Sequence, residues 1–321
     1  MESLLDQTLP RDRFEILVVK NFADEEIDRF LTEHAVEHWV TTEGPLAGKI
    51  LEALARSRGE VITFLEDDDL YVPQRLAVVE EAFEHDPDLG FFRNGFEVID
   101  EEGGPFQGRM PEAVRASYTS ARDLAVSEAD KEQCYPALVD AHSDFNISTM
   151  AVRRDLLQKD PVRFRRLRVG IDRFLLYAAL VSSRSLRLDP RRLTAYRIHA
   201  GNNWIVGQGG AELLGRLDRI MAYDRADEAT IYELVRDSSL TAARRDLEGR
   251  RAVVEAYSAF RRPTVDRRGM MHLLRQFTQY RSTEAVRVNH RLALECAVYV
   301  VSPGAARRLH QQHLNRWLGL E

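Results

Sequence analysis

The amino-acid sequence predicts an α/β fold with a mostly parallel sheet flanked by helices, followed by an all-helical C-terminal region. Three observations lead to this prediction. In the first half of the 321 residues, short runs rich in β-branched residues alternate with amphipathic helical stretches. These runs are rich in apolar residues, which is typical of parallel strands that are buried on both faces. Beyond about residue 210, the periodicity becomes helical.

The first half contains three strand-and-helix pairs. Asp24 is suited to cap the first helix, and Pro73 stands in the first turn of the third. Gly59 is a natural end for the second helix. The predicted strands cover residues 14–19, 36–42 and 61–65, and the predicted helices cover residues 24–35, 45–59 and 73–86.

The elements that follow are more widely spaced. Residues 90–104 predict a strand that ends in a turn, and residues 105–145 predict loops and helix. Two further strands are expected at 147–153 and 193–199, with a helix beginning near Asp172 between them. The change of pattern divides the chain into an α/β domain at 1–205 and a helical region at 206–321, which Pro263 and Pro303 interrupt.

The composition excludes several classes of protein. A net charge of −6 does not provide the basic surface that nucleic-acid binding needs. Cys134 and Cys296 are far apart and form no CxxC motif, which argues against a disulfide framework or a structural zinc site. The N-terminus shows no secretory signal, and the longest apolar stretch, 292–301, contains Glu295 and is too short to span a bilayer. We therefore expect a cytoplasmic protein.

Four consecutive acids, Glu66 to Asp69, directly follow the predicted strand at 61–65. A parallel strand would deliver them to the carboxyl edge of the sheet, where open α/β folds place their ligands. Clustered carboxylates become favourable around a divalent cation, because Mg²⁺ and Mn²⁺ prefer oxygen ligands. The alternative is a solvated acidic turn ahead of the helix at 73–86.

Three motifs together resemble family 2 glycosyltransferases of the GT-A fold. They are "SLLDQTLPRDRFEILVVKNF", "GPLAGKILEALARSRGEVITFLEDDDLYVPQRL" and "LTAYRIHAGNN", in the family's order and spacing over most of residues 3–205. The resemblance places Glu66, Asp67 and Asp68 at the family's DxD position, with Glu in place of the first Asp. It implies a Mn²⁺ or Mg²⁺ ion that bridges the diphosphate of a UDP- or GDP-sugar. The implied metal ligands are Glu66, Asp68, Asp69 and His199, with Asp68 as the principal one.

The resemblance also implies an inverting mechanism. Asp172 would remove the proton from the acceptor hydroxyl, and Asp144 is the reserve candidate for this base. The residues expected to contact the nucleotide-sugar are Lys20, Asp67, Asp68 and His199. Lys20 stands where the family usually carries an acid near the base or ribose of the nucleotide. The acceptor would be a glycan, a lipid-linked molecule or another hydroxyl compound.

One departure from the family pattern leaves a second function open. The family's opening strand precedes the "SLLxQT" helix, whereas this sequence begins inside that helix at Met1. Either the true start lies upstream, or the protein is a degenerate relative that binds or assembles without catalysis. The arginines of the helical region, among them 244, 245, 307 and 308, likewise have two interpretations. They belong to a bundle packed on the catalytic domain, or to a surface that attaches peripherally to an anionic membrane.

Overall fold

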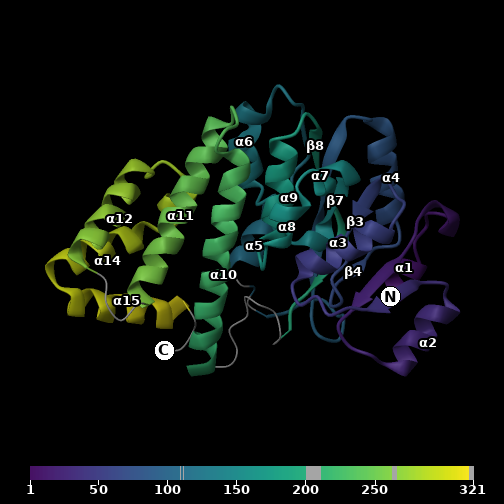
Figure 1. Ribbon diagram of the computed structural model, residues 1–321, viewed down its shortest axis with the longest axis horizontal. Helices are drawn as coiled ribbons and strands as arrows, with labels where there is room; N and C mark the ends of the chain where they lie inside the picture. Colours follow the sequence, from purple (N-terminus) through teal and green to yellow (C-terminus); the bar gives the residue numbers. More distant parts are fainter. Residues whose placement is uncertain (109, 111, 200–210, 262–265, 318–321) are drawn as a thin grey trace. The chain divides into compact units, whose positions relative to one another are not determined.

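The computed structural model describes residues 1–108, 110, 112–199, 211–261 and 266–317 (Figure 1). The chain forms two compact units, unit 1 at Met1–His199 and unit 2 at Ala200–Glu321. The domain boundary expected at residue 205 falls within 200–210, outside the described residues.

Unit 1 contains two sheets. The smaller one pairs β1 (Leu17–Lys20) with β2 (Glu37–Val40) in parallel. The larger one has the order β3-β7-β5-β8-β4, with β6 paired to β8. Its strands are β3 (Val61–Thr63), β4 (Leu70–Tyr71), β5 (Leu89–Ile99), β6 (Leu124–Val126), β7 (Met150–Arg153) and β8 (Ser185–Arg197).

The α/β class is confirmed, but the sheet is mixed rather than mostly parallel. Strand β5 is parallel to β8, whereas β7 is antiparallel to both of its neighbours, β3 and β5. Strands β4 and β6 are also antiparallel to β8. The reason is that β7 comes from a distant part of the chain and enters between β3 and β5. An apolar run predicts burial on both faces, and it does not encode the direction of the neighbouring strand.

Five strands have one edge that lacks a strand partner within the described part of unit 1, namely β1, β2, β3, β4 and β6. Strand β1 pairs with β2 on one side, and β3 pairs with β7 on one side. The side chains of Val61 and Ile62 are half-buried, whereas those of β7 at Met150 to Val152 are buried. Both strands therefore present peptide groups that no other described strand uses.

Helices flank these sheets in unit 1 (Figure 1). The helix expected at 24–35 is α2, and the Asp24 side chain caps it by accepting from the N–H groups of Glu26 and Ile27 at 3.0 Å. Residues 147–149 form a 3₁₀ turn, so the strand expected at 147–153 begins at Met150. The helices are α1 (Glu2–Leu5), α2 (Glu25–Glu33), α3 (Leu46–Arg56), α4 (Arg75–His85), α5 (Glu112–Thr119), α6 (Lys131–Asp140), α7 (Arg154–Gln158), α8 (Pro161–Arg165) and α9 (Ile171–Leu180).

The centre of unit 1 is β5, which is hydrogen-bonded on both edges. Its side chains are buried along its length except for Glu97, and Phe91 and Phe92 are fully buried. A β-bulge at Asn94 and Gly95 brings the backbone close to β8. A side chain at Gly95 would meet the carbonyl oxygen of Pro190 at 2.8 Å. This close approach explains the glycine.

The N-terminal motif is held against the segment that follows the acids. The Gln7 amide donates to the Val72 carbonyl oxygen at 3.0 Å, and its oxygen accepts from the Leu76 N–H at 2.9 Å. The backbone N–H of Thr8 donates to the Pro73 oxygen at 2.8 Å. These contacts join "SLLDQT" to "YVPQRL", so the two motifs form one structural unit.

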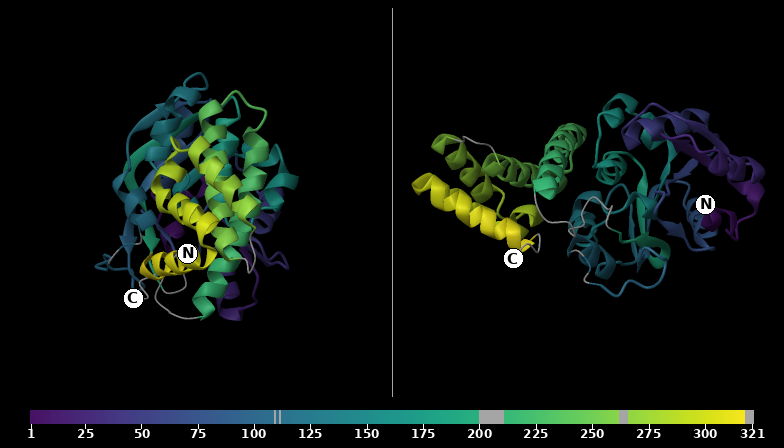
Figure 2. Two further views of the ribbon diagram at one scale, coloured as in Figure 1. Left: turned by 90° about the vertical axis from the view of Figure 1, so that its left-hand side faces the viewer. Right: turned by 90° about the horizontal axis from the view of Figure 1, so that it is seen from below.

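Unit 2 is helical (Figure 2) and has its own apolar core. Leu273, Phe277, Leu292 and Cys296 lie within this core, to which five of the helices contribute. No helix in the described ranges has the length and apolar character needed to cross a bilayer. The helices are α10 (Ala211–Val235), α11 (Thr241–Arg261), α12 (Arg267–Gln279), α13 (Glu284–Val288), α14 (His290–Val301) and α15 (Pro303–Trp317).

Candidate functional site

The four acids form a loop, called here the acid loop (Glu66–Asp69), between β3 and β4. Strand β4 pairs with β8 through Leu70 and Ala195, so the acid loop lies beside the C-terminal end of β8. The four side chains have different environments. Asp67 is exposed, Glu66 and Asp68 are half-buried, and Asp69 is only 3% exposed. A solvated acidic turn would expose all four, so the structure does not support that alternative.

Asp69 is a buried carboxylate whose two oxygens both accept hydrogen bonds. One oxygen accepts from the backbone N–H of Arg197 at 3.0 Å, and the other accepts from the Asn146 side-chain amide at 3.1 Å. Burial raises the pKa of Asp69 to about 6, while hydrogen bonds from Arg197, Ser148 and Asn146 oppose the rise. Asp69 therefore anchors the acid loop to β8 and to the turn before β7.

Asp68 contacts His199, the residue that closes the third motif. Their side chains approach to 2.9 Å between Asp68 Oδ2 and His199 Nε2. The guanidinium of Arg197 holds the loop backbone, because its Nε donates to the Asp68 carbonyl oxygen at 2.7 Å. Two motifs separated by more than a hundred residues thus meet at one carboxylate–imidazole pair.

Asp172 lies in the first turn of α9. Its carboxylate accepts from its neighbour's backbone N–H, that of Arg173, at 2.8 Å. Burial raises the pKa of Asp172 to about 6, with Asp144 adding to the rise and Arg173 opposing it. Asp144, the reserve candidate, forms an ion pair with Arg173 at 3.5 Å. The charge of Arg173 therefore acts on both candidate bases, as an ion pair with Asp144 and as a charge that lowers the pKa of Asp172.

The charges of the acid loop and Asp172 act on one another. The pKa of Glu66 is raised to about 8, first by burial and then by Asp69, Asp68, Asp172 and Asp67. Because Asp172 is among these causes, the predicted base and the predicted metal-binding loop share one electrostatic site. Arg93 supplies buried positive charge nearby, and burial lowers its own pKa to about 10 against the opposing effect of Asp144 and Asp172.

Lys20 has a different neighbourhood from the one expected. It is 4% exposed, forms an ion pair with Asp28 of α2, and lies over the ring of Phe22. Its role in nucleotide binding stays a prediction. Asp67 keeps an exposed carboxylate beside Asp68 and stays a candidate for contact with the donor.

A metal ion would have to draw on few protein ligands here. Among the described side chains, no group of three His, Cys, Asp or Glu is already assembled around a common point. Asp68 and His199 do lie in contact, and carboxylate oxygen and imidazole nitrogen both suit Mn²⁺. Mg²⁺-type sites commonly use one or two protein ligands and complete the coordination with substrate phosphates. The residues present fit such a site.

Sequence reasoning missed three residues that build the site. Asn146, Ser148 and Arg197 tie the acid loop to its surroundings, through Asp69, the Glu66 N–H and the Asp68 backbone respectively. Arg197 was visible within "LTAYRIHAGNN", two residues before His199. Asn146 carried no comparable signal, because its role depends on contacts with residues distant in the chain.

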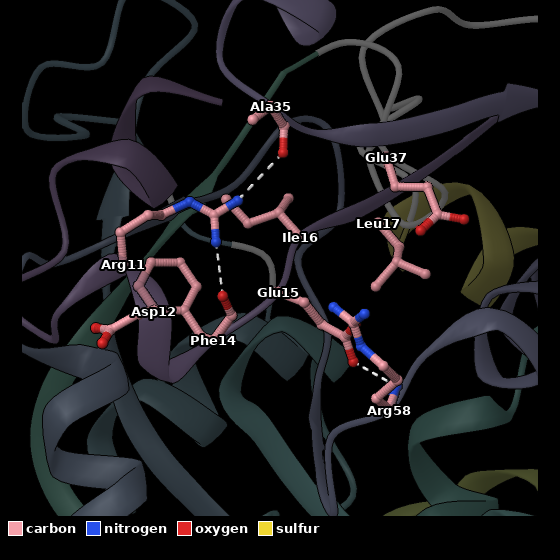
Figure 3. A pocket seen from close by; sticks show the side chains of 9 residues that line it. All are labelled: Arg11, Asp12, Phe14, Glu15, Ile16, Leu17, Ala35, Glu37 and Arg58. Atoms are coloured by element: carbon pink, nitrogen blue, oxygen red, sulfur yellow. Dashed lines mark hydrogen bonds and ion pairs between the residues drawn. The ribbon is translucent and has the colours of Figure 1, made fainter.

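The cavity in Figure 3 lies apart from the acid loop. It measures about 310 Å³ and is lined by residues at the starts of β1 and β2, including Glu15, Leu17 and Glu37. There Glu15 accepts from the N–H of Gly59 at 2.8 Å. None of the candidate site residues is among those that line this cavity.

Comparison with known proteins assigns the first part of the chain to a family. Residues 1–159 match the family model described as Glycosyl transferase family 2. That range contains the acid loop and its contacts with Asn146 and Ser148.

Residues 1–159 form a glycosyltransferase family 2 domain.

Relatives of this family 2 domain agree with the assignment. The chain is 26% identical over 162 residues to an uncharacterized glycosyltransferase of Nostoc sp., covering 49% of this chain and 45% of that protein. It thus spans less than half of that relative's length.

Solved structures share the GT-A-like fold of the family 2 domain at low sequence identity. The crystal structure of S. aureus TarS has a TM-score of 0.57 at 12% identity, covering 95% of this chain and 50% of TarS. Its fragment 1–349 gives the same TM-score at 13% identity, covering 97% and 86% respectively. The mannosyltransferase PcManGT from Pyrobaculum calidifontis, in complex with GDP-Man and Mn²⁺, has a TM-score of 0.51 at 15% identity, covering 94% and 82%.

Proposed function

We propose that this protein is a metal-dependent inverting glycosyltransferase that moves a sugar from a nucleotide-diphosphate donor to an acceptor hydroxyl. The observation that supports the proposal is the contact between Asp68 and His199, together with the effect of the Asp172 charge on the pKa of Glu66 in the acid loop. Asn146 donates to Asp69 of the same loop. The family 2 match supports the reaction class, and the bound Mn²⁺ of PcManGT supports the use of a metal.

Each residue has a distinct task in this proposal. Asp172, in its ionised form, accepts the proton of the attacking acceptor hydroxyl, and the attack displaces the nucleoside diphosphate from the anomeric carbon with inversion. Asp68 and His199 would hold Mn²⁺ or Mg²⁺, which would supply positive charge for the diphosphate leaving group. Asp69 holds the loop in place through its bonds to Arg197 and Asn146.

The donor and the acceptor are proposed on separate grounds. GDP-Man in the PcManGT complex favours a UDP- or GDP-sugar as donor. The acceptor we propose is a glycan or a lipid-linked molecule. Membrane contact through the helical region stays a prediction. Several of its arginines have intramolecular partners, such as Arg245 on the Gln279 carbonyl oxygen and Arg251 over the ring of Tyr232.

The test compares two substitutions with a control on the same unit. We expect Asp172→Asn to lower kcat by about a hundredfold or more, because the base is lost while the shape is kept. Asp68→Asn should abolish the dependence of transfer on added Mn²⁺ or Mg²⁺ together with most of the activity. Asp88→Asn, which changes an exposed carboxylate before β5, should retain wild-type rates. Full activity of Asp68→Asn in the presence of a chelator would refute the proposal.

A catalytically degenerate binding subunit is the second candidate. The observation in its favour is Lys20, whose buried pairing with Asp28 occupies the side chain at a position expected to contact the nucleotide. Titration calorimetry with UDP- and GDP-sugars in the presence of Mn²⁺ separates the two candidates. Donor binding together with transfer supports the enzyme, and absence of donor binding supports the subunit.

A further inference from the structure

Arg197, the last residue of β8, is bound to the acid loop through both its backbone and its side chain. Its backbone N–H donates to Asp69 Oδ1 at 3.0 Å, and its side-chain Nε donates to the Asp68 carbonyl oxygen at 2.7 Å. That carbonyl belongs to the rigid peptide plane that joins Asp68 to Asp69. One residue of β8 therefore holds two successive residues of the acid loop.

The guanidinium of Arg197 also reaches the turn that follows β5. Its Nη1 donates to the carbonyl oxygens of Asp100 at 2.9 Å and of Glu101 at 2.7 Å. Hydrogen bonds close this turn, because the Asp100 N–H donates to the Gly104 carbonyl oxygen at 2.9 Å and the Gly104 N–H donates to Asp100 Oδ1 at 2.7 Å. The turn directly continues the central strand of unit 1. Arg197 therefore ties the acid loop to the centre of the larger sheet.

Each of these three side-chain bonds ends on a backbone carbonyl oxygen and not on a carboxylate. An arginine that pairs with a carboxylate occupies the oxygens that a metal ion would need. Arg197 instead holds Asp68 by its main chain, while the Asp68 carboxylate contacts His199, with 2.9 Å between Oδ2 and Nε2. The arginine thus places a proposed metal ligand without competing for it through these bonds.

We propose that Arg197 is a positioning residue that sets the affinity of the site for Mn²⁺ or Mg²⁺, an inference that rests on the proposed function. By holding Asp68 beside His199, it keeps the two proposed ligands together before an ion binds. Ligands that are already in place lose less conformational entropy on binding, so loss of the Arg197 side chain weakens the binding of the ion.

Positioning and charge predict opposite results when this arginine is removed. If Arg197 acted only through its charge, Arg197→Met would bind a cation more tightly, because a repelling positive charge is lost. If it positions the acid loop, the same variant binds the cation more weakly. Arg197→Lys keeps the charge but lacks the fork that spans the loop and the turn. The control is Arg192→Met, which removes one charge from an exposed arginine of the same strand, paired with Glu97.

The first readout is the binding of Mn²⁺ alone to the full chain, followed by the electron paramagnetic resonance signal of the free ion. We expect Arg197→Met to bind Mn²⁺ at least about tenfold more weakly than the wild type, and Arg197→Lys to lose less. The affinity of Arg192→Met should stay within about threefold of the wild type. Unchanged or tighter binding by Arg197→Met would overturn the proposal.

The second readout is hydrogen–deuterium exchange without metal, on peptides covering residues 66–70 and 99–104. Both peptides should exchange about tenfold faster in Arg197→Met, and neither should change in Arg192→Met. Faster exchange spread evenly over unit 1 would indicate general destabilisation, and that result would also overturn the proposal. If the wild type binds no Mn²⁺, the metal dependence of the proposed function fails, and the exchange experiment still decides whether Arg197 positions the acid loop.

Discussion

At the scale of single residues, the titration of Asp172 governs when the site can act. Burial raises its pKa to about 6, from an ordinary value of 3.8. A general base must be ionised, so this shift moves the acidic limit of activity toward neutral pH. The residue is a better proton acceptor for the same reason.

The raised pKa of Asp172 predicts how activity and stability change with pH. We expect kcat/KM to be constant above pH 7 and to fall about tenfold per unit of pH well below 6, as Asp172 becomes protonated. The folded state binds this proton more tightly than the unfolded state, so the contribution of Asp172 to stability decreases as pH rises from about 4 to 6. Initial rates in buffers of constant ionic strength, with melting temperatures at each pH, check both statements. An acidic limit that stays near pH 4 would contradict the assignment of Asp172 as base.

Sequence reasoning reached the residues that belong to recognisable motifs. Asp68 and His199 were matched to the family pattern, and the structure brings them to 2.9 Å. Asn146 escaped notice, because "DFNIS" resembles any polar turn and its backbone conformation is a tertiary consequence. The partner of Lys20 was equally hidden, since nothing in "VVKNF" indicates that Asp28 of the next helix would reach it.

At the scale of elements, a buried arginine supports the strands around the acid loop. Arg75 of α4 is fully buried beneath the ring of Tyr71, with its guanidinium carbon 3.9 Å from the ring centre. Its Nε donates to Asn94 Oδ1 and its Nη2 donates to the Met150 carbonyl oxygen, both at 3.0 Å. One side chain thus joins α4, β5 and β7.

Removal of the Arg75 side chain should destabilise the folded state. We expect Arg75→Ala to lower the free energy of unfolding by about 3–5 kcal/mol, because it leaves a cavity and two buried acceptors without donors. Arg75→Met restores much of the volume but no hydrogen bonds, so its cost should be smaller. Arg13→Ala provides the contrast, since this exposed arginine pairs with Glu80 and Glu84 on the surface of the same helix. Urea denaturation measures all three, and an unchanged midpoint for Arg75→Ala would argue against the role.

Whether a segment forms a helix or a strand was predictable where its hydrophobic periodicity and the residues at its ends agree. The helix capped by Asp24 and the helix after Pro73 both form as expected, within a few residues. Strand direction was not predictable, because β7 pairs with β3 and β5 across long stretches of chain. The 3₁₀ turn at 147–149 was also missed, since its β-branched Ile147 and Thr149 are typical of a strand.

At the scale of the whole molecule, the second unit carries a core that does not depend on strands. Cys296 is fully buried in it, and its pKa is raised to about 12, first by burial and then by Glu295. The thiolate is the reactive form of cysteine, so this residue should be inert while unit 2 is folded. Cys134 of α6 is half-buried and lies in unit 1.

The two thiols should therefore report separately on the two units. In the native protein, we expect an aromatic disulfide reagent to modify Cys134 alone, and Cys296 to react only after denaturant is added. The variant Cys134→Ser should then show no native reaction, and its reaction in denaturant follows the unfolding of unit 2. Rapid modification of Cys296 in the native state would show that the core of unit 2 opens readily.

The unshared edges of β1 and β3 affect how the protein must be handled. Their outward peptide groups can template an extended segment from another molecule, and the β3 side chains beside them are apolar. A high protein concentration therefore favours intermolecular β-pairing, which dilution avoids. Stock solutions are best kept dilute. Pairing of these strand edges, rather than thermal unfolding, will limit how much protein stays soluble.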